Sequence, residues 1–158
     1  MLEKIYKSFY PIIFAISIFA VLSALYIEYI LSVPACKLCL YQRIPYIFSI
    51  IICFLAYFFP KKNVFIYLII LTFFSSVIVS GYHIGIENGI FSEFSGCTSE
   101  NFNTIDKTEL LQNLNSFFPN CKDVNFKIFG ISLATINFIL SIALIYISIK
   151  YFFYEKNR

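Results

Sequence analysis

Four stretches of the chain are almost wholly apolar, and short polar or charged segments separate them. A helix needs about 20 apolar residues to cross a membrane, and in lipid every backbone polar group must bond within its own element, so these stretches predict spanning helices. The many Phe and Ile residues would favour strands in water, but this internal bonding overrides their propensity in a bilayer. The expected spans cover about residues 11–31, 41–59, 64–81 and 128–149.

The second span is the shortest, because its uninterrupted apolar run covers only residues 44–59. It reaches spanning length if the helix begins near Leu40 or Tyr41, which places Arg43 in its first turn. The first span is too long for the apolar core of a secretion signal, and no convincing cleavage site follows it. We therefore expect the first span to stay in the mature protein.

The composition agrees with a protein that lies mostly in a membrane. Hydrophobic residues make up 59% of the 158 positions and charged residues 13%, whereas a soluble domain carries about 25% charge. The net charge of +3 comes without a basic run, which argues against a nucleic-acid partner. We predict an all-α membrane protein, a four-transmembrane-helix bundle that forms one domain over residues 1–158.

The charges between the spans predict the orientation. The two ends of the chain and the turn around residues 60–63 together hold seven basic and two acidic residues, whereas segment 82–127 holds three basic and six acidic ones. Since Lys and Arg accumulate on the cytoplasmic side, we expect both termini in the cytoplasm. The outer loops then cover about residues 32–40 and 82–127.

The longer outer loop contains a helix signal. Asp106 and Glu109 have the spacing of a capping box, and apolar residues at helical intervals run from Leu110 to Phe118 before Pro119. This pattern predicts a short amphipathic helix, which lies either on the bilayer surface or against the spans.

Four of the five cysteines belong to these outer loops. Cys36 and Cys39 would close a ring too small to add much stability, and such close pairs usually carry redox chemistry or bind metal. Cys97 and Cys121 could form either a second redox pair or a plain loop staple. Pairing 36 with 39 and 97 with 121 is the simplest of three connectivities, whereas Cys53 lies mid-span and is expected to be a small buried apolar residue.

Charged and titratable side chains surround the first pair. Arg43 lies one turn after Cys39 near a helix start, where it would stabilise a Cys39 thiolate or a reduced anionic cofactor, unless it only anchors the helix at the headgroups. His83 and Glu87 are one turn apart and form either an interfacial pair or a proton relay or hydrogen-bond donor to a quinone. Glu28 lies near the outer end of the first span, and its role stays open.

Several electron acceptors can be compared from the sequence. The chain has no haem-attachment motif, a single histidine and no convincing iron–sulfur spacing. A zinc site built from the four outer cysteines is possible, but the second pair lacks the short spacing usual for zinc. A lipid-soluble quinone is the natural acceptor for a protein that lies almost wholly in the membrane.

Three blocks of sequence resemble the disulfide bond formation protein B (DsbB) family. The blocks occur in the family's order over essentially the whole chain, and the first is the most specific. They are Pro34-Ala-Cys36-Lys-Leu-Cys39-Leu-Tyr41-Gln42-Arg43, Gly81-Tyr82-His83-Ile-Gly85-Ile-Glu87, and Phe129-Gly-Ile-Ser-Leu-Ala134 followed by Asn137.

The resemblance implies a bacterial inner-membrane enzyme that reoxidises a periplasmic thioredoxin-fold thiol oxidase, DsbA, and passes its electrons to ubiquinone or menaquinone. The partner would form a mixed disulfide with Cys97, and Cys121 would be the loop partner of Cys97. Electrons would then reach Cys36 and Cys39, and Cys39 would contact the quinone ring beside Arg43, with His83 as a further quinone contact. Both cysteine loops would be periplasmic.

Two other functions remain open at this stage. A relative of vitamin K epoxide reductase also has four spans and a C-x-x-C pair, although that family sets its pair near the last span. A protein without catalysis, with zinc bound or with its loops stapled by disulfides, would carry the same cysteines.

Overall fold

The computed structural model describes residues 9–59, 64–92, 121–122, 126–128 and 130–157. Four helical segments of this part are long and apolar enough to cross a membrane, which confirms the predicted four-helix membrane protein. The segments run over Phe9–Ile30, Lys37–Phe58, Val64–Glu87 and Leu133–Lys156.

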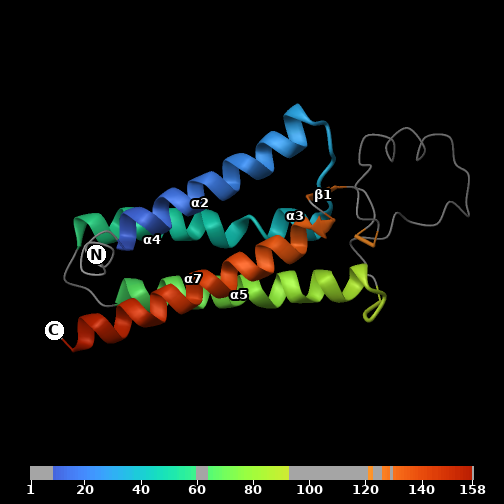
Figure 1. Cartoon of the computed structure of the whole chain (residues 1–158). Helices are drawn as coiled ribbons and strands as arrows, with labels where there is room; N and C mark the ends of the chain where they lie inside the picture. Colours follow the sequence, from blue (N-terminus) through green and yellow to red (C-terminus); the bar gives the residue numbers. More distant parts are fainter. Residues whose placement is uncertain (1–8, 60–63, 93–120, 123–125, 129, 158) are drawn as a thin grey trace, which may run out of the picture.

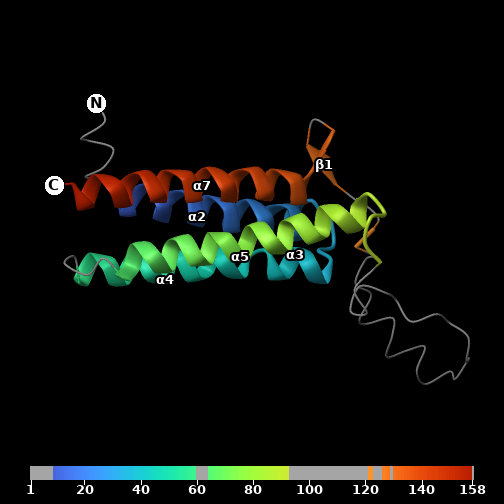
Figure 2. The ribbon, with the colours of Figure 1, turned by 90° about the horizontal axis from the view of Figure 1, so that it is seen from below.

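The four segments lie side by side as an elongated bundle (Figures 1 and 2). Helix α5 (Val64–Glu87) packs along α7 (Leu133–Lys156), and α2 (Phe9–Leu25) packs along α4 (Ile44–Phe58), which also contacts α5. The ends of α4 and α7 and the start of α5 share one end of the bundle. Helix α3 (Lys37–Tyr41) lies at the opposite end, with the end of α5.

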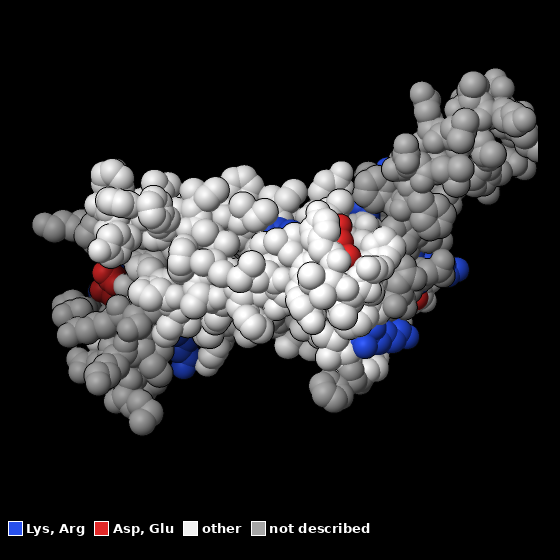
Figure 3. All heavy atoms as spheres, turned by 90° about the horizontal axis from the view of Figure 1, so that it is seen from above, with Lys and Arg blue, Asp and Glu red and all other residues white. Residues whose placement is uncertain are grey.

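The bundle buries its core between the helices and turns large apolar side chains outward. Ile13, Ile69 and Phe73 are fully buried, whereas Phe19 on α2 and Tyr57 on α4 are 73% and 81% exposed. On the face drawn in Figure 3, charged side chains are few among the described residues. Such an apolar exterior matches lipid, because the outer surface of a spanning helix faces acyl chains.

Two of the four segments change helical geometry on the side that carries the predicted outer loops. The first ends in a π-helix, η1 (Tyr26–Ile30), which includes Glu28. The second is divided into α3 and α4 around Gln42 and Arg43. Pro45 explains the division, because proline has no N–H for the bond to the preceding turn and its ring crowds the carbonyl there.

The boundaries of the spans differ from the sequence prediction at the long outer loop. Helix α5 continues to Glu87 and therefore includes His83, which the sequence placed just beyond the span. The last span begins later, at Leu133, because β1 (Lys127–Ile128) and β2 (Ile131–Ser132) form a small antiparallel pair before it. The predicted amphipathic helix between Leu110 and Phe118 lies outside the described residues.

Two residues explain why the last span begins only at Leu133. Gly130 has a φ of +82°, a left-handed conformation that glycine adopts at little cost, and this lets the chain reverse between β1 and β2. Ser132 then caps α7, since its side chain accepts a hydrogen bond from the backbone N–H of Thr135 at 3.2 Å.

Candidate functional site

Cys36 and Cys39 lie on the first turn of α3, where their side chains face each other. Cys36 is the N-cap residue, and its Sγ accepts a hydrogen bond from the backbone N–H of Cys39 at 3.2 Å. The two Sγ atoms are 2.6 Å apart, and both residues carry free thiols. The sequence named pairing of Cys36 with Cys39 as the simplest connectivity, and the structure brings these two sulfurs together as free thiols.

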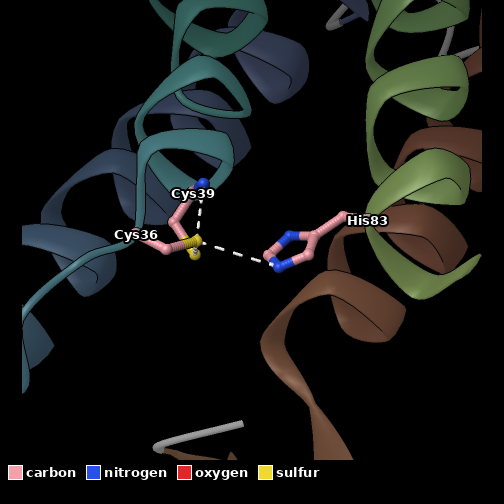
Figure 4. Close-up of side chains that lie close together, drawn as sticks. All are labelled: Cys36, Cys39 and His83. Carbon is pink, nitrogen blue, oxygen red and sulfur yellow. Dashed lines mark hydrogen bonds between the residues drawn. The ribbon is translucent and has the colours of Figure 1, made fainter. Parts of the chain in front are cut away.

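His83 approaches this dithiol from α5 (Figure 4). Its Nε2 lies 3.8 Å from the Sγ of Cys36 and 3.8 Å from Oε1 of Glu87, one turn along the same helix. His83 is only 4% exposed. A residue 47 positions away in the chain therefore takes part in the environment of the first cysteine pair.

Cys121 packs against the same pair. It forms one buried cluster with Cys36, Leu38 and Ile86, and Cys39 lies against that cluster. Cys121 is disulfide-bonded. Because Cys36, Cys39 and Cys53 are free, the bonded partner lies outside the described residues, as does Cys97, its predicted partner.

The polar contacts distinguish the two thiols of the first pair. The thiol of Cys39 hydrogen-bonds Cys36, and together with the hydrogen bond from His83 this lowers the pKa of Cys36 from 9.0 to about 5. The sequence assigned the thiolate to Cys39 on account of Arg43. The structure favours Cys36, because the capping N–H, the neighbouring thiol and the imidazole all point at its sulfur.

Arg43 and Glu28 form an ion pair between the second and first spans. The Arg43 guanidinium donates to Oε2 of Glu28, and the two side chains are only 16% and 22% exposed. The sequence left Glu28 without a partner and offered headgroup anchoring as one interpretation of Arg43. Since burial of a charge requires compensation, each residue now explains how the other is tolerated there.

A cavity of about 890 Å³ opens beside the dithiol. Its walls are mostly apolar, with Phe19 and Ala20 from α2 and Leu140 from α7 among the lining side chains. The polar part of the lining is concentrated in a few residues. These are Ser23, Glu28, Cys36, Cys39, Gln42, Arg43, Tyr46, His83, Glu87, Cys121 and Asn137.

Behind His83, a series of buried polar side chains crosses the bundle. The Gln42 amide nitrogen lies 2.9 Å from Nδ1 of His83, and its oxygen accepts from Asn137 at 3.2 Å. Tyr46 donates to the Asn137 oxygen at 2.5 Å. Sequence reasoning quoted Gln42 and Asn137 only as motif letters and gave them no role, although polar residues within apolar spans are the signal that could have drawn attention to them.

The contacts of Cys36, Cys39 and His83 can be compared with those of a metal site. The ligand atoms of Cys36, Cys39 and His83 lie within 4.8 Å of one another, as a metal site would require. A histidine that binds metal usually donates its other ring N–H to an acceptor, but Nδ1 here faces the donor nitrogen of Gln42. Cys121, a member of the possible four-cysteine zinc set, is already in a disulfide.

Comparison with known proteins agrees with this geometry. The family model described as disulfide bond formation protein DsbB matches residues 6–150. The uncharacterized protein RP370 of Rickettsia prowazekii (strain Madrid E) is 32% identical over 97% of this chain and 91% of its own length. No solved structure matches. The chain belongs to the DsbB family of disulfide bond formation proteins, multi-pass membrane proteins with an oxidoreductase role.

Proposed function

We propose that this protein is a quinone-dependent thiol oxidase that reoxidises a periplasmic, DsbA-like dithiol protein. The observation that carries the proposal is the shared location of the Cys36–Cys39 pair, buried Cys121 and a largely apolar cavity at one end of a spanning bundle. A thiol pair next to Cys121 can exchange disulfides with it, and an apolar cavity suits a lipid-soluble acceptor.

The electrons enter at the second pair in this proposal. A thiolate of the partner attacks Cys97, forms a mixed disulfide and releases the Cys121 thiolate, and the partner's second thiol then completes the partner's own disulfide. The Cys121 thiolate attacks Cys36 of an oxidised Cys36–Cys39 pair and releases Cys39 as a thiolate. Cys97 then attacks Cys121, restores the 97–121 disulfide and leaves the first pair as a dithiol.

The residues around the cavity have complementary tasks. A quinone, when bound, would take up the two electrons that the pair gives as it closes to a disulfide, together with two protons. Arg43 supplies a fixed positive charge at the cavity wall, and Cys39 supplies the sulfur on that side. The apolar walls exclude water from the reacting sulfurs, and His83 holds a hydrogen bond to Cys36. Ubiquinone and menaquinone both fit this chemistry.

The location follows from the same proposal. Both termini would be cytoplasmic and the cysteine loops periplasmic, in a bacterial inner membrane, as the excess of Lys and Arg at the chain ends indicates. A membrane-impermeant thiol reagent applied to intact spheroplasts tests this orientation. Labelling of reduced Cys97 from outside is the expected result, and labelling only after lysis would contradict it.

The catalytic test uses the full chain in lipid nanodiscs with a quinone and a reduced thioredoxin-fold dithiol protein. We expect quinone reduction that stops in Cys39→Ser and continues in Cys53→Ser, which removes a thiol buried in the middle of the bundle. Quinone reduction that persists in Cys39→Ser would overturn the proposal.

The partner-binding step has a separate test. A Cys121→Ser variant leaves Cys97 as a thiol that can attack the disulfide of an oxidised partner and release one partner thiolate. It should therefore hold the partner as a mixed disulfide on Cys97, and peptide mass mapping would identify the linkage. A partner trapped on Cys121 in a Cys97→Ser variant, with none trapped on Cys97, would reverse the roles assigned to these two cysteines.

A further inference from the structure

We propose that Gln42, supported by Asn137 and Tyr46, is a positioning residue that holds the His83 imidazole as the tautomer with its proton on Nε2, directed at the Sγ of Cys36. The inference deepens the proposed thiol oxidase by giving His83 the role of a hydrogen-bond donor to the dithiol. The sequence left His83 open between an interfacial pair with Glu87, a proton relay and a hydrogen-bond donor to a quinone.

The donor in each hydrogen bond of this series can be assigned in order, from Tyr46 through Asn137 and Gln42 to His83. Tyr46 O–H lies 2.5 Å from the Asn137 side-chain oxygen, a distance that fits O–H···O and is shorter than N–H···O bonds normally are. The Asn137 nitrogen must then face Gln42, and it donates to the Gln42 oxygen at 3.2 Å. This leaves the Gln42 nitrogen, which can only donate, against Nδ1 of His83 at 2.9 Å.

The contacts of the second ring nitrogen, Nε2, favour the same tautomer. Nε2 faces two acceptors, the Cys36 sulfur and the Glu87 carboxylate, each 3.8 Å away. If Nδ1 carried the proton instead, Nε2 would direct its lone pair at a carboxylate and at a sulfur that ionises readily. The neutral ring with Nε2–H therefore satisfies both of its sides, and the reverse arrangement satisfies neither.

Burial makes this arrangement persistent. Gln42 is 7% exposed, His83 4% and Tyr46 4%, so water has little access to replace a lost bond. Turning one amide alone would set donor against donor or acceptor against acceptor, and an unpaired buried polar group is costly. The series comes from α3–α4, α5 and α7, so the packing of these helices fixes the ring nitrogen that faces the thiols.

The tautomer has a chemical consequence for the dithiol. Because Nδ1 already accepts a hydrogen bond from Gln42, His83 offers no free ring nitrogen for the thiol proton. It therefore stabilises negative charge on Cys36 by donation and does not serve as the base that removes the thiol proton. That proton must leave by another route, and Glu87, whose carboxylate lies 3.8 Å from Nε2, is a titratable group beside the site.

The single histidine of the chain makes a direct test possible. The full chain, purified without a polyhistidine tag, is labelled with ¹⁵N-histidine, reduced and placed in lipid nanodiscs without quinone or partner. Its ¹⁵N spectrum then contains the two ring nitrogens of His83 alone. We expect Nε2 to show the shift of a protonated nitrogen and Nδ1 that of a bare one. A protonated Nδ1 in this protein would overturn the inference.

Variants test the role assigned to the series. Gln42→Glu replaces the donor nitrogen by an acceptor of the same shape, so Nδ1 should take up a proton and its signal should move to the protonated position. Asn157→Asp makes the same amide-to-carboxylate change at the far end of α7 and should leave both nitrogens unchanged. An unchanged Nδ1 in folded Gln42→Glu would show that Gln42 does not set the tautomer.

A milder variant covers the case in which Gln42→Glu does not fold. Tyr46→Phe keeps the ring that packs on Phe73 and removes only the hydroxyl that anchors Asn137. Mixed tautomers are expected, and a purely Nε2-protonated ring would contradict the role of Tyr46. These spectra need no turnover, so an absence of quinone reduction would leave this inference standing and would count only against the proposed function.

Discussion

The dithiol form of Cys36 and Cys39 should release only one proton when it is oxidised at neutral pH. The pKa of Cys36 is lowered from 9.0 to about 5, chiefly by the hydrogen bond from the Cys39 thiol and then by His83. When the pH is above about 5, the reduced pair therefore holds a single proton, which the two sulfurs share across their contact. Changing the pH is then the perturbation, and the midpoint potential of the pair is the quantity to follow.

The size of the effect can be worked out from this pKa. A tenfold change in the equilibrium constant corresponds to about 30 mV for a two-electron couple. Each proton released on oxidation changes the constant tenfold per pH unit, so one proton gives about 30 mV per unit and two give about 60 mV. We expect the smaller slope above pH 5 and the larger slope below it.

The direction of the shift in midpoint potential follows from the fact that only the reduced pair ionises. The low pKa stabilises the reduced pair, and this stabilisation relative to an ordinary thiol is fully present above the unperturbed pKa of 9.0 and is lost as the pH falls through about 5. At pH 7 the shift amounts to about 3 kcal/mol, or about 60 mV towards a more oxidising pair, before any change in the disulfide form is counted.

The assay equilibrates quinone-free protein in nanodiscs with dithiol redox buffers, alkylates the free thiols and quantifies peptides that contain Cys36 and Cys39. Mass mapping keeps this pair separate from Cys97 and Cys121, so all cysteines can remain in place. A slope near 60 mV per unit between about pH 6 and about pH 8 would show that both thiols keep their protons, and the argument for a Cys36 thiolate would be wrong.

Three further predictions concern other contacts. His83→Ala should raise the pKa of Cys36 and move the break in the potential curve to higher pH, since a hydrogen bond to the Cys36 sulfur is lost. Glu28→Gln and Arg43→Leu should be non-additive in unfolding titrations, with a coupling of about 1–3 kcal/mol for their buried bond. Gly81→Leu should lower the unfolding free energy by about 1–3 kcal/mol, because even a β-carbon added there would lie 3.3 Å from a phenylalanine ring of α7.

Each of these predictions has a contradicting result. A break at the same pH in His83→Ala would remove the histidine from the causes of the low pKa. Strictly additive effects of the Glu28 and Arg43 variants would show that the ion pair adds no stability. Ile78→Leu, at a position that is 57% exposed on α5, is the control for Gly81→Leu, and an equal loss in both would argue against tight packing at Gly81.

The sequence predicted the parts of the fold that depend on apolar length. All four spans were expected, since lipid leaves an apolar stretch no alternative to a helix. Their ends at the long outer loop were less predictable, because His83 and Glu87 are polar and nonetheless continue α5. Their burial against the cysteine cluster compensates for that polarity, and this packing depends on residues far away in the chain.

The site shows the same division between local and distant information. The spacing of Cys36, Cys39 and Arg43 is local, and it was sufficient to predict a redox pair beside a cation. The ion pair from Glu28 to Arg43 and the bond from Asn137 to Gln42 join residues 15 and 95 positions apart. No periodicity in a single sequence encodes such a pairing, because it depends on how the helices rotate against one another.

The cavity beside α2 is walled partly by side chains such as Phe19, which is 73% exposed and faces outward. A molecule that enters past such a wall arrives by diffusion within the two-dimensional bilayer, whereas a protein partner for the cysteine loops arrives from water. The two encounter rates then respond to different kinds of dilution. Adding lipid at constant volume would slow the first encounter and leave the second unchanged, so the ratio of protein to lipid becomes a kinetic variable alongside the concentration of the protein itself.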